Sequence, residues 1–424
     1  MNYCIKNGKV LIGDSDFRIL DTELCIRDGL VYKLGADLDH SDYEIIDAKG
    51  QLVMPGLINM HTHAYMSCLK NFADDVPFQT WLFDRIMPVE DSLSPEEAYW
   101  SSQMACIEML RTGTTAFVDM HMFQGQSCRA AAQAGMRAFI GRGLVGEDLE
   151  TDGQSRVLEA MAEKEQWESD LIHFLLSPHA IYTCSEKLLR QIHEKAQQLG
   201  MRKQIHLSES TFEVETCLQN QGKTPVEFLN DIGFLDTNTL LAHCVKLTDR
   251  DIELIAASEA SVVTNPASNA KLGNGIAPVA KLLERGVNVC LGTDSVASNN
   301  TLNMFREMGL LTLLHKAFTG DPVALPSTAV LQTATVNAAK ALGLGGQLGT
   351  IAEGALADLI FVDLSAPSLF PNNNIISSLC YSANGGEVTS VIIGGRLVMK
   401  DRELLTIDTE RVYYETARII EKRT

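Results

Sequence analysis

Long apolar runs are missing from this sequence of 424 residues. No stretch approaches the roughly 20 consecutive apolar residues that a membrane-spanning helix needs. The first residues do not place a basic segment before an apolar core, so the N-terminus does not resemble a secretory leader. We therefore expect no membrane partner.

Basic residues are also scarce. The chain has 35 Lys and Arg against 54 Asp and Glu, which gives a formal net charge of −19 at pH 7. Nucleic-acid binding depends on clustered Lys and Arg that neutralise phosphates, and no such cluster is present. The composition argues against a nucleic-acid partner, and the negative charge is better explained by solubility.

The ten cysteines are scattered, and none forms a Cys-x-x-Cys pair. Their spacing argues against a structural zinc knuckle or a dithiol redox site. Several occupy apolar surroundings, as Cys290 does within 287–291, where a thiol acts as a small hydrophobic side chain. We expect a reduced, cytoplasmic protein.

Short β-structure is predicted at both ends of the chain. Residues 1–54 contain brief extended runs separated by turn signals such as Asn7-Gly8. Further strands are predicted at 358–363 and 390–398, and an amphipathic helix at 409–422 ends the chain. Because neither end is large enough to bury a core, we expect 1–54 and 347–424 to form one small β-sandwich domain, with the helix appended.

The middle of the chain, residues 55–346, alternates short apolar strands with helical segments. One helix begins with a capping box at Ser94 and Glu97. Alternation of this kind predicts an α/β fold, a (β/α)8 barrel of the TIM type. Eight strands are expected at 57–60, 115–119, 136–140, 171–176, 202–207, 239–242, 261–264 and 287–291.

Chemically active side chains follow the predicted strands. In a (β/α)8 barrel the active site lies at the C-terminal ends of the strands. Ionisable groups stand at the ends of the first, fourth, fifth, sixth and eighth predicted strands: His61, His63, His179, His206, Glu209, His243 and Asp294.

His61 and His63 are two residues apart and therefore point to the same face of a strand. With His206 and Asp294 they form a ligand set that suits Zn²⁺, although Fe²⁺ or Mn²⁺ could occupy the same site. The fourth strand lacks the lysine that bridges two metals in several hydrolases, so we predict one metal ion.

Two further groups would serve the metal-activated water. His243 would orient this water or relay its proton, and the alternative is that it is a fourth histidine ligand. Glu209, three residues after His206, would take a proton from water and deliver it to the leaving side. The sequence contains no His-x-Glu paired with Pro-Cys-x-x-Cys, which excludes the cysteine-ligated zinc deaminases.

These residues resemble the amidohydrolase superfamily. The resemblance lies in 55–63, His206, His243 and 292–294. Over nearly its whole length the chain resembles the 5'-methylthioadenosine/S-adenosylhomocysteine deaminases of that superfamily. The closer matches are 73–75, 80–82, 88–90, 142–144, 178–182, 242–245, 265–269 and 293–300.

The resemblance implies a reaction and a substrate class. It implies hydrolytic deamination of the adenine ring of 5'-methylthioadenosine, S-adenosylhomocysteine or a related adenosine analogue, giving the inosine product and ammonia. Glu209 would protonate a ring nitrogen, and Asp294 and His243 would help to deprotonate the water. A homo-oligomer with a small-molecule nucleoside substrate is expected.

Substrate-binding residues also follow from the resemblance. It implies that Glu90 binds the ribose hydroxyls and that His179 binds a purine nitrogen. Arg142 matches a substrate-binding arginine that can reach a neighbouring subunit's pocket, and Arg156 is a candidate for a second one. Trp81 is either a lid residue against the substrate or an aromatic side chain that packs a loop.

Two other classes remain open. The chain could be an amidohydrolase for another cyclic amidine, as in guanine deaminases or triazine chlorohydrolases. Glu90 is the discriminator here, since a free base has no ribose to bind. A catalytically inactive barrel used for binding is the third class, and the complete set of metal and acid/base residues argues against it.

Overall fold

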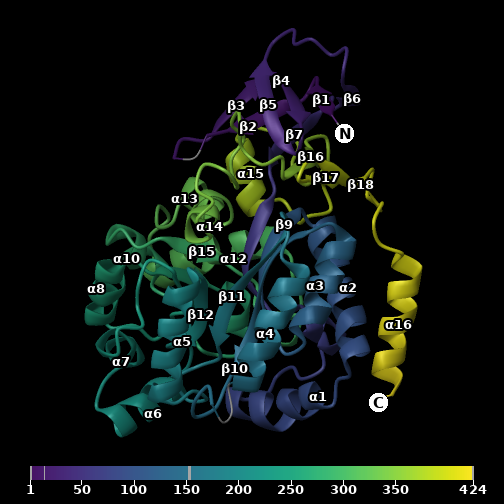
Figure 1. The fold of residues 1–424 in the computed structure, drawn as a ribbon. Coiled ribbons are helices and arrows are strands. Elements are labelled where there is room, and N and C mark those ends of the chain that lie inside the picture. Colours follow the sequence, from purple (N-terminus) through teal and green to yellow (C-terminus); the bar gives the residue numbers. More distant parts are fainter. Residues whose placement is uncertain (1, 14, 151–153, 423–424) are drawn as a thin grey trace.

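A parallel eight-stranded barrel forms the body of the molecule (Figure 1). The computed structural model describes residues 2–13, 15–150 and 154–422. Neighbouring strands pair in chain order, so the predicted α/β fold with a (β/α)8 barrel is confirmed. The strands are β8 (Leu57–Thr62), β9 (Thr114–His121), β10 (Arg137–Leu144), β11 (Ile172–Pro178), β12 (Arg202–Leu207), β13 (Thr239–His243), β14 (Ser261–Thr264) and β15 (Val289–Leu291).

The first and last strands meet just beyond the end of β15. The backbone N–H of Asp294 donates to the carbonyl of His61 at 2.9 Å. The side chain of Asn59 donates to Oγ1 of Thr293 at 2.7 Å and accepts the backbone N–H of the same residue at 3.0 Å. A Cβ at Gly292 would lie 2.8 Å from the His61 nitrogen, so only glycine permits this approach.

Helices surround the barrel (Figure 1). The predicted capping box is present, since Ser94 Oγ accepts from Glu97 N–H while the Glu97 carboxylate accepts from Ser94 N–H. The helices of the barrel region are η1 (Ala64–Leu69), η2 (Thr80–Ile86), α1 (Met87–Asp91), α2 (Pro95–Arg111), α3 (Gln124–Ala134), α4 (Gln154–Trp167), α5 (Glu186–Leu199), α6 (Thr211–Gln221), α7 (Pro225–Asp231), α8 (Asp249–Ser258), α9 (Pro266–Lys271), α10 (Val279–Glu284), α11 (Val296–Asn299), α12 (Met304–Thr319), α13 (Ser327–Thr333) and α14 (Val336–Ala341).

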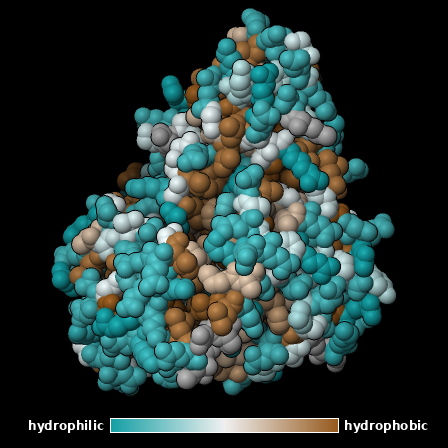
Figure 2. Space-filling view, in the orientation of Figure 1, coloured by the Kyte–Doolittle hydropathy of each residue, from teal (hydrophilic) through white to brown (hydrophobic). Residues whose placement is uncertain are grey.

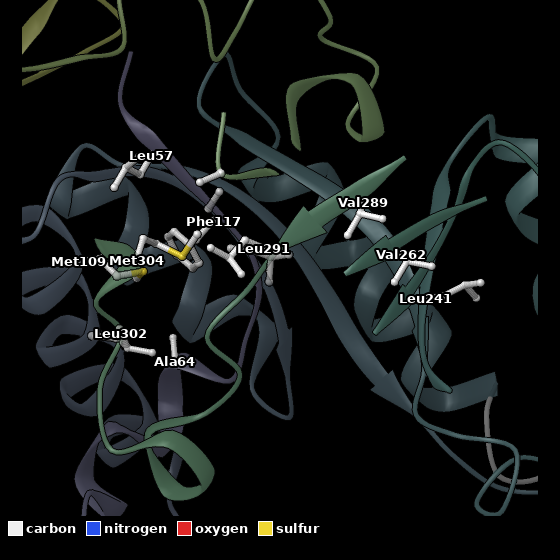
Figure 3. Packing of buried hydrophobic residues seen from close by; sticks show 14 of the residues in the cluster. Leu57, Ala64, Met109, Phe117, Leu241, Val262, Val289, Leu291, Leu302 and Met304 are labelled. Carbon is white, nitrogen blue, oxygen red and sulfur yellow. The ribbon is translucent and has the colours of Figure 1, made fainter. Parts of the chain in front are cut away.

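Two apolar layers hold the barrel together. Leu57 belongs to the outer layer between strands and helices, part of which is drawn in Figure 3. Its neighbour Ile58 belongs to the inner layer, together with Val118 and Cys290. This alternation follows the two-residue repeat of a strand. Because the interior contains apolar side chains, it is a packed core that supports the polar C-terminal end.

Both chain ends contribute to a separate pair of sheets, as predicted. One sheet has the order β5-β4-β1-β6 and the other β19-β18-β17-β16-β7-β2-β3. In the second sheet β7 from the first part of the chain pairs antiparallel with β16 from the last part. The strands are β1 (Tyr3–Lys6), β2 (Lys9–Ile12), β3 (Arg18–Asp21), β4 (Glu23–Arg27), β5 (Leu30–Gly35), β6 (Glu44–Asp47), β7 (Gln51–Pro55), β16 (Leu359–Asp363), β17 (Val388–Ile393), β18 (Arg396–Lys400) and β19 (Glu403–Leu404).

The two sheets share one apolar cluster that includes Ile5, Leu24, Val53, Phe361 and Ile392. Helix α15 (Ile375–Tyr381) follows β16, and the final helix α16 (Thr409–Glu421) lies beside α2 (Figure 1). The domain boundaries 1–54 with 347–424 and 55–346 stay a prediction.

The visible surface is mainly hydrophilic, and its hydrophobic residues gather chiefly along the middle of the view (Figure 2). Within the described ranges, no helix combines the length and the apolar character that crossing a bilayer would require.

Candidate active site

A cavity opens at the C-terminal ends of the barrel strands, on the side away from the β-sandwich. The residues that end β8, β12, β13 and β15 line it together with residues from η2 and α1. The structure thus brings together side chains from the predicted strand ends. Its lining includes His63, Glu90, Arg156, His179, His206, Glu209, His243 and Asp294.

Three imidazoles and one carboxylate converge at the base of this cavity. The Nε2 atoms of His63 and His206 are 3.3 Å apart. Oδ1 of Asp294 lies 3.6 Å from Nε2 of His61 and 3.4 Å from Nε2 of His63. All four side chains are buried. Nitrogen and oxygen donors at such separations can surround one small cation.

Each of the three imidazole rings is held from behind by a hydrogen bond that leaves Nε2 directed into the cluster. The acceptor is always an oxygen, so Nδ1 carries the proton. The Nδ1···O distances are 3.1 Å from His61 to Oε1 of Gln204, 2.9 Å from His63 to the carbonyl of Met120, and 2.8 Å from His206 to the carbonyl of His179.

One atom of the cluster tests whether a metal fits. Nε2 of His61 is buried and has no hydrogen-bond partner. Burial, reinforced by His63, lowers the pKa of His61 to about 3, so its ring is neutral and Nε2 presents a lone pair. An unpartnered buried acceptor is costly unless something binds it. A metal ion satisfies this lone pair, and the residues present fit such an ion.

Asp294 is fixed as a carboxylate. Its Oδ2 accepts from the hydroxyls of Ser268 at 2.6 Å and Ser298 at 2.8 Å. Burial opposes ionisation, but His243 and the hydrogen bond from Ser268 hold the pKa of Asp294 below its usual value. Asp294 also adopts a left-handed backbone conformation, with φ of 61°. Such strain is uncommon and concentrates at functional sites.

His243 and Glu209 face each other above the cluster. Nδ1 of His243 donates to Oδ1 of Asn269 at 2.9 Å, which turns Nε2 toward the cavity. Oε1 of Glu209 accepts from Nδ2 of Asn274 at 3.0 Å. Burial raises the pKa of Glu209, although His243 opposes the shift. A buried carboxyl of this kind can both accept and return a proton.

Glu90 lies farther along the same cavity, on α1. Burial, with a contribution from Asp91, raises the pKa of its carboxyl to about 8. The wall on this side is largely apolar and comes from the segment around η2, which has the π-helical form often found at functional sites. Its apolar residues are Phe78, Trp81, Leu82, Phe83, Ile86 and Met87.

His179 reaches the cavity from the end of β11. Burial, with His63 and His243 adding to it, lowers the pKa of His179 to about 4, so the ring is neutral. Its Nδ1 lies 2.9 Å from the Thr183 hydroxyl. A hydroxyl can donate to or accept from this nitrogen, and therefore Nε2 can be the donor or the acceptor toward a bound molecule.

The other predicted substrate residues differ in whether they line the cavity. Trp81 lines the cavity while its indole N–H donates to the carbonyl of Ala297 at 3.3 Å, so it both packs a loop and borders the cavity. Arg156 also lines the cavity. Arg142 does not, because its side chain pairs with Glu159 of α4 at 3.0 Å.

Comparison with known proteins identifies the family. The amidohydrolase family model matches residues 52–398. The chain belongs to the amidohydrolase family. The 5-methylthioadenosine/S-adenosylhomocysteine deaminase of Thermococcus sibiricus is 44% identical over 402 residues, which cover 94% of each chain. The 5'-deoxyadenosine deaminase of Methanosarcina mazei is 41% identical over 422 residues, covering 99% of this chain and 97% of its own.

A solved structure agrees with this assignment. The crystal structure of an adenosine deaminase from Xanthomonas campestris with bound zinc superimposes with a TM-score of 0.94. It is 31% identical and covers 99% of this chain and 98% of its own. The predicted family resemblance is confirmed, and the protein is a metal-dependent hydrolase.

Several residues that hold the site of this amidohydrolase were missed in the sequence. Gln204 stands two residues before His206, so strand periodicity could have placed both on one face. Asn269 lies within a segment that was noted only for its resemblance. Ser298 follows Asp294 by four residues, in α11, so this contact is local. Asn274 and Ser268 are distant in sequence from Glu209 and Asp294, and no spacing pairs them.

Proposed function

We propose that this amidohydrolase hydrolytically deaminates the adenine ring of 5'-methylthioadenosine, S-adenosylhomocysteine or a related adenosine analogue. The observation that carries the proposal is a single cavity with two distinct ends. One end holds the imidazole and carboxylate cluster, and the other places Glu90 in an apolar wall. A nucleoside matches this arrangement, with its base at the cluster and its ribose at Glu90.

We infer that one Zn²⁺ ion per chain is held by His61, His63, His206 and Asp294. The unpartnered Nε2 of His61 and the four converging donors support this assignment. A zinc-bound deaminase of similar structure supports the choice of metal. The ion, when bound, supplies an activated water for attack on the ring.

Glu209 and His243 then transfer the protons of the attacking water. Oε2 of Glu209 is free of the Asn274 contact and can take a proton from the water and pass it to a ring nitrogen. His243 orients the water through Nε2, and Asp294 helps to remove its proton. Water adds to C6, the C6–N bond breaks, and the amine leaves as ammonia while C6 becomes a carbonyl.

The remaining residues select the nucleoside. A Glu90 carboxylate accepts two hydrogen bonds from the vicinal ribose hydroxyls. The Thr183 hydroxyl donates to the carbonyl of Ala180 at 3.1 Å and contacts Nδ1 of His179, which leaves Nε2 of His179 to bind a purine nitrogen. Trp81 covers the sugar or its sulfur substituent. Arg156, whose Nη1 is buried without a hydrogen-bond partner, is positioned to bind a carboxylate at the 5' end of the substrate.

Assembly and location are further parts of the proposal. We infer a homo-oligomer in which Arg142, outside its own cavity, approaches a neighbouring subunit. Sedimentation analysis at assay concentration tests this, and a monomer would contradict it. All ten cysteines are free thiols, which supports a reducing, cytoplasmic location.

Ammonia release tests the reaction itself. The purified enzyme is assayed with 5'-methylthioadenosine, S-adenosylhomocysteine, adenosine and 5'-deoxyadenosine, beside the free bases guanine and adenine. We expect turnover of at least one nucleoside and far less of the bases. Turnover of a free base with no reaction on any nucleoside would overturn the proposal and favour a guanine-type enzyme.

A further inference from the structure

A second group of metal-ligand side chains lies in the β-sandwich, away from the active site. Strands β1 and β4 pair antiparallel with Cys4 directly opposite Cys25. Their neighbours Tyr3 and Ile5 belong to the core between the two sheets. Because strand side chains alternate, Cys4 and Cys25 lie together on the other face of the sheet. Both are nevertheless buried.

The segment 36–43 between β5 and β6 is tied to this face. The backbone N–H of Leu38 donates to Oε2 of Glu23 at 2.9 Å. Nε2 of His40 lies 2.9 Å from the same oxygen. His40 is thereby brought to Cys4, although the two residues are far apart in sequence.

The donor atoms are already close together. One ligand atom each from Cys4, Glu23 and His40 lie within 4.8 Å of one another. Cys25, directly opposite Cys4 on the neighbouring strand, adds a fourth donor. Two sulfurs, an imidazole and a carboxylate form a donor set suited to tetrahedral Zn²⁺.

We propose that Cys4, Cys25, Glu23 and His40 bind a second divalent cation, Zn²⁺, in a structural site. Four protein ligands leave no position open for a substrate, which distinguishes this site from a catalytic one. The ion would fasten the segment 36–43 to the sheet. The His40 side chain is 25% exposed, so an ion can reach the site from solvent.

Charge and protons balance at this site. The two thiols lose their protons to solvent as the metal–sulfur bonds form. The resulting two thiolates and the Glu23 carboxylate carry three negative charges, which the divalent cation and Lys6 neutralise. Nζ of Lys6 lies 3.3 Å from Oε1 of Glu23. An ion bound by Oε2 would replace the contact between this oxygen and Nε2 of His40.

Cobalt substitution distinguishes this site from the active site. The active-site donors are nitrogen and oxygen, whereas the proposed site contains sulfur. The full-length protein is stripped with a chelator under reducing conditions and titrated with Co²⁺. We expect two bound ions per chain and a near-ultraviolet thiolate-to-cobalt charge-transfer band, which only the second site can produce. The protein as purified should contain two zinc ions per chain.

Matched variants test whether the charge-transfer band comes from the proposed site. Cys4→Ser and His40→Gln should each remove or strongly weaken it and lower the metal content by one ion, while deaminase activity is retained. His40→Gln changes a partly exposed side chain and guards against misfolding. Cys290→Ser, a buried cysteine of the barrel interior, should keep the band.

Two results would overturn the proposal. One is a wild-type protein that binds a single Co²⁺ ion without a charge-transfer band. The other is a band that survives in both Cys4→Ser and His40→Gln. Neither result depends on the substrate of the enzyme, so failure of this proposal is distinct from failure of the proposed function.

Discussion

Nε2 of His243 lies 3.8 Å from Oε2 of Glu209, with both atoms directed into the cavity. This distance is too long for a hydrogen bond, so a third group can sit between them. Each side chain is fixed from behind, His243 by Asn269 and Glu209 by Asn274. In the proposed mechanism the pair therefore offers two positioned proton-transfer groups to one reacting water.

Replacement of Glu209 by Gln should abolish most of the activity without removing the metal. General acid–base groups contribute about 10²–10⁴-fold, and we expect kcat to fall by that factor. Metal content, measured by elemental analysis, should be unchanged. Glu215→Gln, at an exposed position of α6, is the control and should behave like wild type. Near-normal kcat in Glu209→Gln would exclude Glu209 as the proton carrier.

Replacement of Gln204 by Leu should weaken metal binding without touching the metal directly. The change removes the acceptor that holds Nδ1 of His61. Loss of such an outer hydrogen bond typically costs about 10–100-fold in metal affinity or activity. Titration of the stripped enzyme with Zn²⁺, following recovery of activity, measures this. Unaltered affinity would show that His61 needs no support from Gln204.

Glu90 should make nucleoside binding depend on pH. Its pKa is about 8 in the free protein, so it is mostly protonated at neutral pH. The ionised form is the one that accepts both ribose hydroxyls. KM for the nucleoside should therefore fall as pH rises through about 8. Glu90→Ala should raise KM and leave metal affinity unchanged, and equal loss of both would assign Glu90 a structural role.

Asp91→Asn tests whether Glu90 causes the pH dependence of KM, because it should shift that dependence in a known direction. The Asp91 charge raises the pKa of Glu90, second to burial. Its removal should shift the midpoint of the KM profile to lower pH, while Glu90→Gln should eliminate the pH dependence. A profile that is identical in wild type and Glu90→Gln would assign the titration to another group.

Glu307 should make stability depend on pH. Its carboxylate accepts from Ala267 N–H at 3.0 Å and from Asn299 Nδ2 at 2.8 Å, joining the loops after β14 and β15. Burial raises its pKa from 4.5 to about 7. Between these values the native state holds the extra proton, so stability falls as pH rises and this contribution levels off above about 7.

Thermal unfolding across about pH 5–8 measures this slope. Glu307→Gln cannot titrate and should show a shallower decline of Tm with rising pH than wild type. Arg306→Gln, at the exposed neighbouring position, removes a charge that lowers the pKa of Glu307 and should extend the decline of Tm to higher pH. Equal slopes in all three proteins would show that Glu307 does not titrate in this range.

Most of the fold could be predicted because it follows local periodicity. The eight barrel strands and the cap at Ser94 are set by apolar repeats and by short-range hydrogen bonds. Within 1–54 the expected extended runs are 3–5, 9–12, 22–26, 30–34 and 44–47, so β3 and β7 were missed, as was the short β19 near the other end. Only two of the four β3 residues are apolar, and β7 runs almost directly into β8, from which the sequence alone does not separate it.

The sequence by itself determined which side chains are the candidate metal-binding and proton-transfer groups. His61 and His63 share a strand face, and His206, His243 and Asp294 follow further strands whose C-terminal ends must meet in a parallel barrel. The site's chemistry could therefore be inferred before any distances were known.

Only the tertiary structure decided which atoms hydrogen-bond the side chains of the site. It also decided which residues from distant parts of the sequence come into contact. Asn274 reaches Glu209 across 65 residues, and Arg142 turns away from the cavity toward Glu159. Cys4, Glu23 and His40 converge without any recognisable spacing. Contacts between loops depend on how separate elements pack, and periodicity along one element carries no information about that.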